Sequence, residues 1–447
     1  IQKILWFAFN TRIFIILLQA VFNAVIPDHD ANVFISPEDP TLRKTSADSI
    51  IEKIFGGLKR WDGQYFIHIS QYGYTYENCL AFFPLFPLIV RHLANLINSV
   101  SSSFLNYHSN LLVSATLINI VFFIKSADVL HRLSLRVLKS ESKAYKSVIL
   151  YCVNPASIFF VAPYSESLFA FMSFYTMLKC TEPETLRFAN IDMITAIPVG
   201  FSMITRSNGS LNLGFIFYTS FKNTIEKTIP EIMYKYRTLK NKIIIPALML
   251  PLLTSALALF MTTIVAIMPF VLVQAYNYFK FCIVTENTLP EFLLNSEFVL
   301  PGNAESPWCN KTLPVSYSYI QSHYWNVGLF KYYQIKQLPN FILALPVLVL
   351  ILYNYNISYF GYTTKISCRP KQYSKGFGTN DPVYFVYVVH VMFLTIFSIM
   401  FVHIQVTTRL LASASPVLYW ICSNKINLYM LTYHCKTYSY HFLLLEH

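Results

Sequence analysis

Apolar stretches separated by short polar segments run along the whole chain. A helix that crosses the hydrocarbon core of a membrane needs roughly 20 apolar residues. The predicted spans are residues 4–26, 79–97, 111–124, 148–160, 167–178, 191–204, 243–279, 341–353 and 383–403, with a weaker run after Pro416. The pattern therefore predicts an all-α polytopic membrane protein.

The polar segments divide the chain into five parts. We expect residues 1–27 to form a first transmembrane helix and not a cleaved signal peptide, because Asn10, Arg12 and Asn23 interrupt the apolar run. The other four parts are a loop at 28–78, transmembrane helices with short loops at 79–280, a second loop at 281–339, and C-terminal transmembrane helices at 340–447.

Charge in the loops predicts their side of the membrane. The stretches 125–146, 222–242 and 365–375 are rich in Lys and Arg and are assigned to the cytosol, whereas 28–77 and 286–305 lean acidic and are assigned to the lumen. Two predicted spans separate the first loop from 125–146, although an odd number of crossings is required. We interpret residues 81–87, which hold two prolines, as a re-entrant segment that removes this conflict.

Composition supports a membrane protein. The 447 residues are 55% hydrophobic and 13% charged, whereas soluble domains carry about 25% charged residues. The net charge of +12 does not indicate nucleic-acid binding, because Lys and Arg lie in the short segments between apolar stretches. The eight Cys form no CxxC pair, so we expect no metal site, but Cys282 and Cys309 would be able to pair in a luminal loop.

The same assignment brings polar clusters together on the luminal side. They are the segments 163–166 (PYSE), 206–209 (RSNG), 321–326 (QSHYWN) and 403–405 (HIQ) with Arg409. From these clusters we expect substrate-binding residues, namely Tyr164, Glu166, Arg206, Asn208, Gln321, Trp325, Asn326, His403, Gln405 and Arg409. A cytosolic half that stays apolar would argue against a lipid scramblase, which needs a continuous polar path.

The first loop contains the strongest catalytic candidate. Asp62 follows Trp61 after an amphipathic stretch, 50–58, that can lie on the membrane surface. A carboxylate beside an indole offers a base next to a face on which a sugar can stack, and sugar transfer needs a base at the acceptor hydroxyl. The alternative is that Asp62 caps a short helix.

The other candidates have alternatives too. Ser165 can cap the helix that begins near Leu168, and Arg206 can extend to the membrane surface instead of binding a phosphate. A metal site on His390 and His403 is not expected, because no carboxylate accompanies them at ligand spacing.

Glycosylation patterns occur at three places. Asn310-Lys311-Thr312 lies in the loop assigned to the lumen. Those at Asn208 and Asn356 lie close to predicted spans.

The chain resembles the PIG-V family of GPI mannosyltransferases along nearly its whole length. The segments that carry the resemblance are 22–29 (FNAVIPDH), 61–66 (WDGQYF), 73–74 (GY), 81–87 (AFFPLFP), 154–156 (NPA), 164–166 (YSE), 206–209 (RSNG), 307–309 (PWC), 317–321 (YSYIQ), 324–328 (YWNVG), 337–341 (QLPNF), 403–406 (HIQV), 408–409 (TR) and 416–420 (PVLYW). Their number and order make the match specific.

The resemblance implies a GT-C type helical bundle with a luminal first loop that carries the catalytic acid, Asp62. It implies transfer of the second, α1,6-linked mannose from dolichyl phosphate mannose to a mannosyl-glucosaminyl-phosphatidylinositol intermediate, by inversion. The expected location is the endoplasmic reticulum membrane, with the active site in the lumen. The expected partners are membrane lipids, the donor and the GPI precursor, with room for an accessory membrane subunit and with no cofactor.

The sequence also departs from the family, because the residues after Trp420 differ from the family's tail; a truncated or divergent C-terminus is expected. The alternatives in function are another dolichyl-phosphate-sugar transferase and a non-catalytic scramblase or assembly subunit. The segments 206–209 and 324–328 favour GPI mannose transfer.

Overall fold

The computed structural model describes residues 2–26, 33–182, 187–188, 191–238, 245–283, 289–294, 298–302, 306–367 and 382–425. The helices are α1 (Gln2–Val25), α2 (Ser46–Phe55), α3 (Asp62–Tyr72), α4 (Leu85–Ser101), α5 (Tyr107–Leu138), α6 (Glu141–Cys152), α7 (Glu166–Cys180), α8 (Met193–Met203), α9 (Leu213–Asn223), α10 (Ile229–Thr238), α11 (Ile245–Tyr278), α12 (Ser316–Trp325), α13 (Leu338–Ser367), α14 (Pro382–Phe401), α15 (Ile404–Ala414) and α16 (Val417–Lys425). The strands β1 (Arg187–Phe188) and β2 (Ile191–Asp192) form one antiparallel pair.

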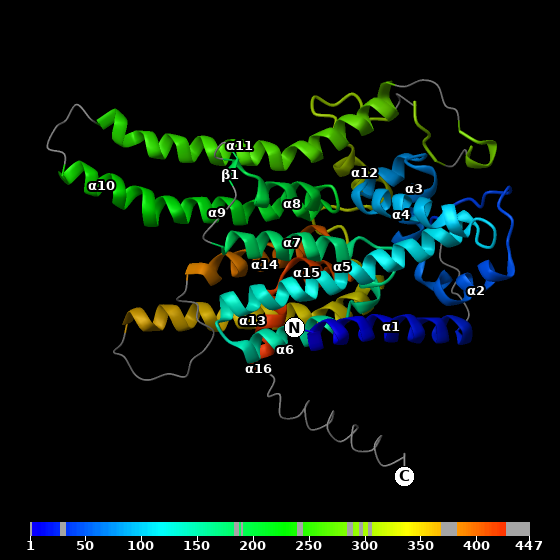
Figure 1. Ribbon diagram of the computed structural model, residues 1–447, viewed down its shortest axis with the longest axis horizontal. Helices are drawn as coiled ribbons and strands as arrows, with labels where there is room; N and C mark the ends of the chain where they lie inside the picture. The colour runs from blue at the N-terminus through cyan, green and yellow to red at the C-terminus, as the bar shows by residue number, and fades with distance from the viewer. Residues whose placement is uncertain are drawn as a thin grey trace, which may run out of the picture.

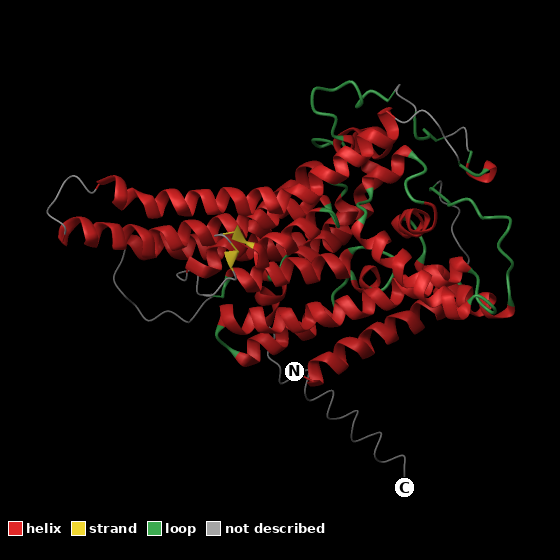
Figure 2. Ribbon diagram, turned by 45° about the horizontal axis from the view of Figure 1, so that its top comes forward, coloured by secondary structure: helices red, strands yellow, loops and turns green. Residues whose placement is uncertain are grey.

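The protein is a helical, multi-pass membrane protein, as predicted. Five segments of the described chain are long and apolar enough to cross a membrane, namely Gln2–Val25, Tyr107–Leu138, Met249–Ile283, Ile335–Asn354 and Tyr384–Phe401. The long helices run side by side, with α2, α3, α4 and α12 at one end of the bundle and α10 at the other (Figure 1). Most loops gather at the first of these ends, which we name the α3 end (Figure 2).

The position of α4 determines how often the chain crosses the membrane between the first loop and the basic stretch 125–146. The predicted span at 79–97 is wrong: a 3-10 turn (Glu77–Ala81) precedes α4, and α4 stays at the α3 end beside α3 (Figure 1). Its buried residues Phe86, Val90 and Ala94 pack in one cluster with Leu111 and Leu112 of α5, so α4 is amphipathic. Between the first loop and residue 138, α5 is therefore the one helix that runs from the α3 end to the opposite end (Figure 1).

The basic stretch at 125–146 is also corrected. We expected a loop, but α5 continues through Lys125 to Leu138, and α6 begins at Glu141. Buried residues such as Ala127 and Leu130 keep an apolar stripe on this part of α5, so its charged residues lie on the other faces of a continuous helix. The predicted span at 148–160 likewise ends early, because α6 stops at Cys152 before a separate 3-10 turn (Ser157–Phe160).

A buried arginine explains the interruption of the first apolar run. Arg12 of α1 is fully buried, and its guanidinium donates to the carbonyl oxygens of Ser157 at 2.9 Å and Cys152 at 2.6 Å. It also lies 3.9 Å from the ring centroid of Phe123. Carbonyl oxygens at a helix end lack donors within the helix. Arg12 supplies donors to such carbonyls where the chain breaks after α6 inside the bundle. That break leads to the segment 163–166.

Gly209 is needed for the close approach of two backbones, which gives a testable expectation. A methyl group added at Gly209 would lie 2.3 Å from the carbonyl carbon and oxygen of Ser202, and neither can move without shifting α8. We expect Gly209→Ala to lower the free energy of unfolding by roughly 1–3 kcal/mol. It should also reduce transfer activity, because the same 3-10 turn (Ser207–Asn212) follows Arg206 directly.

Gly214 in α9 provides the matched control. Nothing lies within 4 Å of a methyl group added there, so Gly214→Ala should leave stability unchanged or raise it by up to about 1 kcal/mol. Thermal unfolding of both variants in the same detergent is the measurement. Equal melting temperatures for the two variants would contradict the close packing at Gly209.

Candidate active site

Asp62 begins α3 and faces an arginine from the far end of the sequence. Arg409 of α15 donates from Nη2 to Oδ2 of Asp62 at 2.5 Å. The N-cap position of α3 is occupied by Trp61, which makes no capping bond through its side chain. The helix-cap interpretation of Asp62 is therefore not supported, because its carboxylate is engaged in a tertiary ion pair.

Trp61 presents its side chain to the surroundings. Its backbone adopts φ 54°, a conformation that is uncommon for residues other than Gly, and its side chain is 59% exposed. Local strain of this kind clusters at binding and catalytic sites, where the surrounding structure maintains it. An exposed indole beside Asp62 fits the sugar-stacking hypothesis.

Glu166 links the two arginines of the site. It begins α7 and is 0% exposed, and its Oε1 accepts from Nη1 of Arg206 at 2.5 Å. The same oxygen lies 3.7 Å from Nη1 of Arg409. The interpretation of Arg206 as a residue that extends to the membrane surface is therefore wrong, since its guanidinium is paired inside the bundle.

Asp62, Arg409, Glu166 and Arg206 thus form a row of alternating charges, which we name the charge row. Burial disfavours the charged form of Arg409, but the carboxylates of Asp62 and Glu166 outweigh it and raise the Arg409 pKa above its ordinary value. The guanidinium therefore stays charged at every physiological pH. An anion that enters the site meets a permanent positive charge.

Tyr164 connects the charge row to the first loop. Its hydroxyl donates to the carbonyl oxygen of Arg60 at 2.9 Å, and the guanidinium of Arg409 lies 5.4 Å from its ring centroid. Ser165, which precedes α7, makes no capping bond through its side chain, so the capping interpretation of Ser165 is wrong.

A wall of aromatic rings stands beside Asp62. Tyr65 is stacked between Phe34 and Phe82, with ring centroids 4.3 Å apart on each side, and Trp325 lies 5.9 Å from both Tyr65 and Phe82. Burial raises the pKa of the Tyr65 hydroxyl, and the nearby Cys79 and Asp62 raise it further. Trp325 of α12 therefore lies beside Tyr65 of the first loop, and its role in substrate binding stays a prediction.

The remaining predicted residues are less closely joined to Asp62. Nδ2 of Asn208 is buried without a hydrogen-bond partner among the described residues. Asn326 ends α12 with φ 52°. His403 precedes α15 and stacks on Tyr332 at 4.5 Å, and burial lowers its pKa. Within the described part of the chain, no hydrogen bond joins the side chains of Gln321 and Gln405 to the charge row.

Glu77 is a further buried carboxylate that was not predicted from the sequence. This carboxylate is 1% exposed and accepts three hydrogen bonds from the second loop and α12. The donors are Oγ of Ser306 at 2.5 Å, Nε1 of Trp308 at 2.7 Å and the hydroxyl of Tyr324 at 2.8 Å. Tyr324 directly precedes Trp325, so Glu77 fixes the part of α12 that faces Tyr65. The sequence contained one signal that could have pointed to Glu77, namely an acidic residue beside an apolar run with no basic residue nearby.

We expect Glu77→Gln to loosen the second loop. The amide keeps one acceptor oxygen but turns a donor toward the hydroxyl of Tyr324, and one or two charge-assisted bonds at about 1.5–3 kcal/mol each are lost. Limited proteolysis of the second loop should become faster, and the KM for the acceptor should rise more than kcat falls. Glu291→Gln, at an exposed position of the same loop, is the control. Unchanged proteolysis of the Glu77 variant would contradict this role.

The second loop contains the predicted disulfide. Cys282 and Cys309 are bonded, with their Cα atoms 5.7 Å apart. The two histidines that we considered for a metal site lie in different surroundings, since His390 packs on Phe215 and His403 on Tyr332. Within the described residues, no three His, Cys, Asp or Glu side chains converge in a way that would hold a metal ion.

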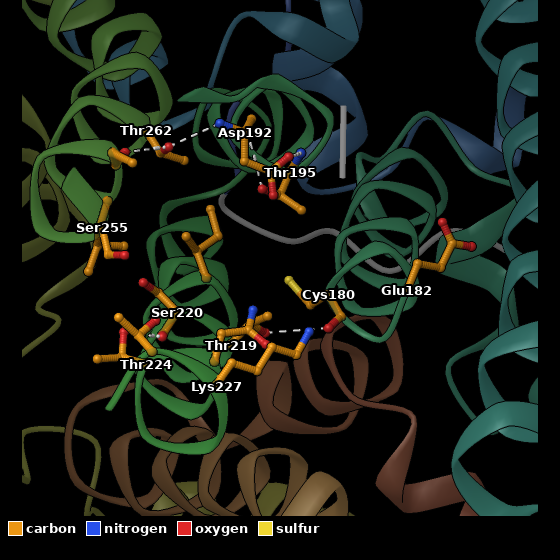
Figure 3. Close-up of a pocket in the computed structure, with 15 residues that line it drawn as sticks. Cys180, Glu182, Asp192, Thr195, Thr219, Ser220, Thr224, Lys227, Ser255 and Thr262 are labelled. Carbon is orange, nitrogen blue, oxygen red and sulfur yellow. Dashed lines mark hydrogen bonds between the residues drawn. The ribbon is translucent and has the colours of Figure 1, made fainter. Parts of the chain in front are cut away.

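A polar cavity at the other end of the bundle corrects the expectation of an apolar half. Its volume is about 340 Å³, and α8, α9 and α11 contribute its walls (Figure 3). The hydroxyl side chains that line it are those of Thr195, Thr219, Ser220, Thr224, Thr228, Ser255 and Thr262. Thr224 and Thr262 donate to carbonyls of Ser220 and Ala258 in their own helices, which satisfies these donors without a ligand. The cavity is separate from the charge row.

Three expectations cannot be compared with the structure. The departure from the family after Trp420 falls largely on 426–447, most of the basic stretch 365–375 falls on 368–381, and both segments lie outside the described residues. The side chain of Asn356 is also outside them.

Comparison with known proteins identifies the family. The description "Mannosyltransferase (PIG-V)" matches residues 1–438. GPI mannosyltransferase 2 of Drosophila melanogaster is 36% identical over 95% of this chain and 91% of its own length. GPI alpha-1,6-mannosyltransferase 2 is 36% identical in Mus musculus and 34% in Homo sapiens, each over 94% of this chain and 83% of its own length. No solved structure matches. The chain thus belongs to the PIG-V family of mannosyltransferases.

Proposed function

We propose that this protein adds the second, α1,6-linked mannose to a mannosyl-glucosaminyl-phosphatidylinositol intermediate of GPI-anchor biosynthesis. The donor is dolichyl phosphate mannose, and the reaction takes place on the luminal face of the endoplasmic reticulum membrane. The names of the relatives support the acceptor class and the linkage. The observation that carries the chemistry is the contact between Asp62 and Arg409 beside the buried Glu166.

Two features support a luminal α3 end. Disulfides persist in oxidising compartments such as the lumen, and the Cys282–Cys309 bond lies in the loop that packs on Glu77 at this end. The opposite end contains Lys222, Lys227, Lys235 and Arg237 on α9, α10 and the turn between them, as the excess of positive charge in cytosolic segments requires.

Asp62 acts as the base in a single displacement. Its carboxylate takes the proton of the acceptor hydroxyl, and the hydroxyl oxygen forms a bond to the anomeric carbon of mannose. The bond from that carbon to the phosphate oxygen breaks at the same time, so a β-linked donor yields an α-linked product. Dolichyl phosphate leaves, and Arg409 and Arg206 stabilise the negative charge that develops on it.

The charge balance of the site favours a donor with a single phosphate. Two guanidinium groups face two carboxylates, so the charge row carries no net charge. A phosphodiester adds one negative charge, whereas a nucleotide diphosphate sugar adds two, and each added charge has to be compensated in a partly buried site. The prediction that no cofactor is used stays open to experiment, and so does the question whether an accessory membrane subunit takes part.

Mannose transfer in microsomes tests the proposal. The microsomes come from cells that lack their own second GPI mannosyltransferase, and radiolabelled dolichyl phosphate mannose is the donor. We expect the protein to restore the two-mannose glycolipid, with the new linkage cleaved by an α1,6-specific mannosidase. If mannose goes instead to a different dolichol-dependent acceptor, or if no transfer occurs while the protein is present in the membrane, the proposal is wrong.

A further inference from the structure

The turn between the disulfide and α12 displays an acceptor for glycosylation. Asn310, Lys311 and Thr312 are exposed and directly follow Cys309. Leu313 is exposed as well, and α12 begins at Ser316. The pattern Asn-X-Thr is the acceptor that oligosaccharyltransferase recognises in the lumen. Nothing in the transfer reaction uses these side chains.

The fold distinguishes this site from the other patterns in the chain. Asn208-Gly209-Ser210 lies in a 3-10 turn whose Gly209 packs against the backbone of Ser202, and Nδ2 of Asn208 is buried. A glycan on that nitrogen would have to pass through the charge row region beside Arg206. Asn310 has no such obstacle, because its side chain points to the surroundings of an exposed turn.

We propose that Asn310 carries an N-linked glycan, which is attached before the second loop closes on the first. The amide Nδ2 forms a bond to the anomeric carbon of an oligosaccharide carried on a lipid pyrophosphate. The bond from that carbon to the pyrophosphate oxygen breaks, the lipid pyrophosphate leaves, and Nδ2 loses one proton to the transferase. The proposal rests on the luminal orientation of the α3 end given under Proposed function.

The order of events follows from how tightly the turn is held once the loop has folded. Trp308 is 0% exposed and donates to Glu77, and Cys309 is bonded to Cys282. Within the turn, the amide of Cys309 donates to the carbonyl of Ser306 at 3.0 Å, and the amide of Lys311 donates to that of Trp308 at 3.3 Å. A transferase has to fit the acceptor segment into its own site, which this turn prevents. The chain is therefore modified while it is still open.

Gel mobility with and without endoglycosidase tests the site. The tagged full-length chain is expressed in mammalian cells as wild type and as Asn310→Gln, Thr312→Ala, Thr312→Ser and Asn208→Gln variants. We expect the wild type, Thr312→Ser and Asn208→Gln to lose the mass of one glycan on digestion, and Asn310→Gln and Thr312→Ala to be insensitive. Because Asn310 projects away from the packed side of the turn, Asn310→Gln should transfer mannose within twofold of wild type.

The disulfide separates failure of this proposal from failure of the proposed orientation. In the same preparations, free thiols are alkylated with and without prior reduction, and the peptides that contain Cys282 and Cys309 are measured by mass spectrometry. An oxidised pair together with an insensitive wild type overturns the glycan and leaves the luminal orientation standing. Reduced cysteines and no glycan overturn both. An endoglycosidase shift that persists in Asn310→Gln overturns the choice of site.

Discussion

Replacement of Asp62 by Asn is expected to reduce mannose transfer by about 10²–10⁴-fold, the range that a positioned general base contributes. The amide cannot take the proton of the acceptor hydroxyl, yet its oxygen can still accept a hydrogen bond from Arg409. The fold should therefore survive, and the loss should appear mainly in kcat. The measurement is the rate of two-mannose glycolipid formation at matched expression, with thermal unfolding as a check on folding.

Asp39→Asn is the matched control for this experiment. Asp39 lies in the same loop and is half-buried, and its carboxylate accepts from the backbone amide and the hydroxyl of Thr41. We expect its transfer rate to stay within twofold of wild type, because the hydrogen bonds of the Asp39 carboxylate are local to the turn with Thr41. Transfer by Asp62→Asn at more than a tenth of the wild-type rate would remove Asp62 from the role of base.

Replacement of Arg409 by Gln should reduce both stability and transfer. The change leaves Asp62 without its partner and removes one of the two positive charges near the buried Glu166. Breaking a buried ion pair in this way lowers the free energy of unfolding by about 3–5 kcal/mol. It also removes a positive charge near the leaving phosphate, and loss of one such group lowers the rate by roughly 10²–10³-fold. Arg409→Lys should recover part of the stability but little of the rate, because the ammonium lacks the planar fork.

A double variant separates the ion pair from other effects. Asp62→Asn combined with Arg409→Gln removes both charges, so it should be destabilised by less than the sum of the two single changes, with a coupling of about 0.5–3 kcal/mol. Lys235→Gln is the control, because Lys235 forms an exposed pair with Glu231 within α10 and should change stability by less than about 1 kcal/mol. Additive melting temperatures would show that Asp62 and Arg409 do not interact in solution.

The comparison of α4 with α5 explains where prediction from sequence failed. Both contain apolar runs, and hydropathy alone treated both as spans. The run that begins at residue 79 includes Pro84, which stands at the N-cap of α4, and Pro87, which lies in its first turn where a proline is tolerated. The helix therefore begins at Leu85, and it buries one face against α5. The stretch after Lys125 was wrongly predicted as a loop, because its charged residues lower the hydropathy. They lie on one side of α5, and the other side of this helix is packed.

The site was foreseen as a set of residues and not as an arrangement. Tyr164, Glu166, Arg206 and Arg409 were predicted from polar clusters between apolar stretches, and Asp62 from its place beside Trp61 in the first loop. The structure brings all five together. Glu77 was not predicted, because its partners Ser306, Trp308 and Tyr324 lie more than 200 positions away and have no charge. No local pattern records such a contact.

By itself, the sequence determined that this is a helical membrane protein of the PIG-V type, that acidic and basic stretches alternate, and which residues are candidates for the chemistry. These properties depend on composition and local order, because the membrane selects apolar helices and the translocation machinery responds to charge near their ends. Only the tertiary structure decided that Arg409 pairs with Asp62, that Glu77 holds the second loop, and that α4 does not cross. Those choices follow from packing and from satisfying buried charges, and both depend on which distant segments meet.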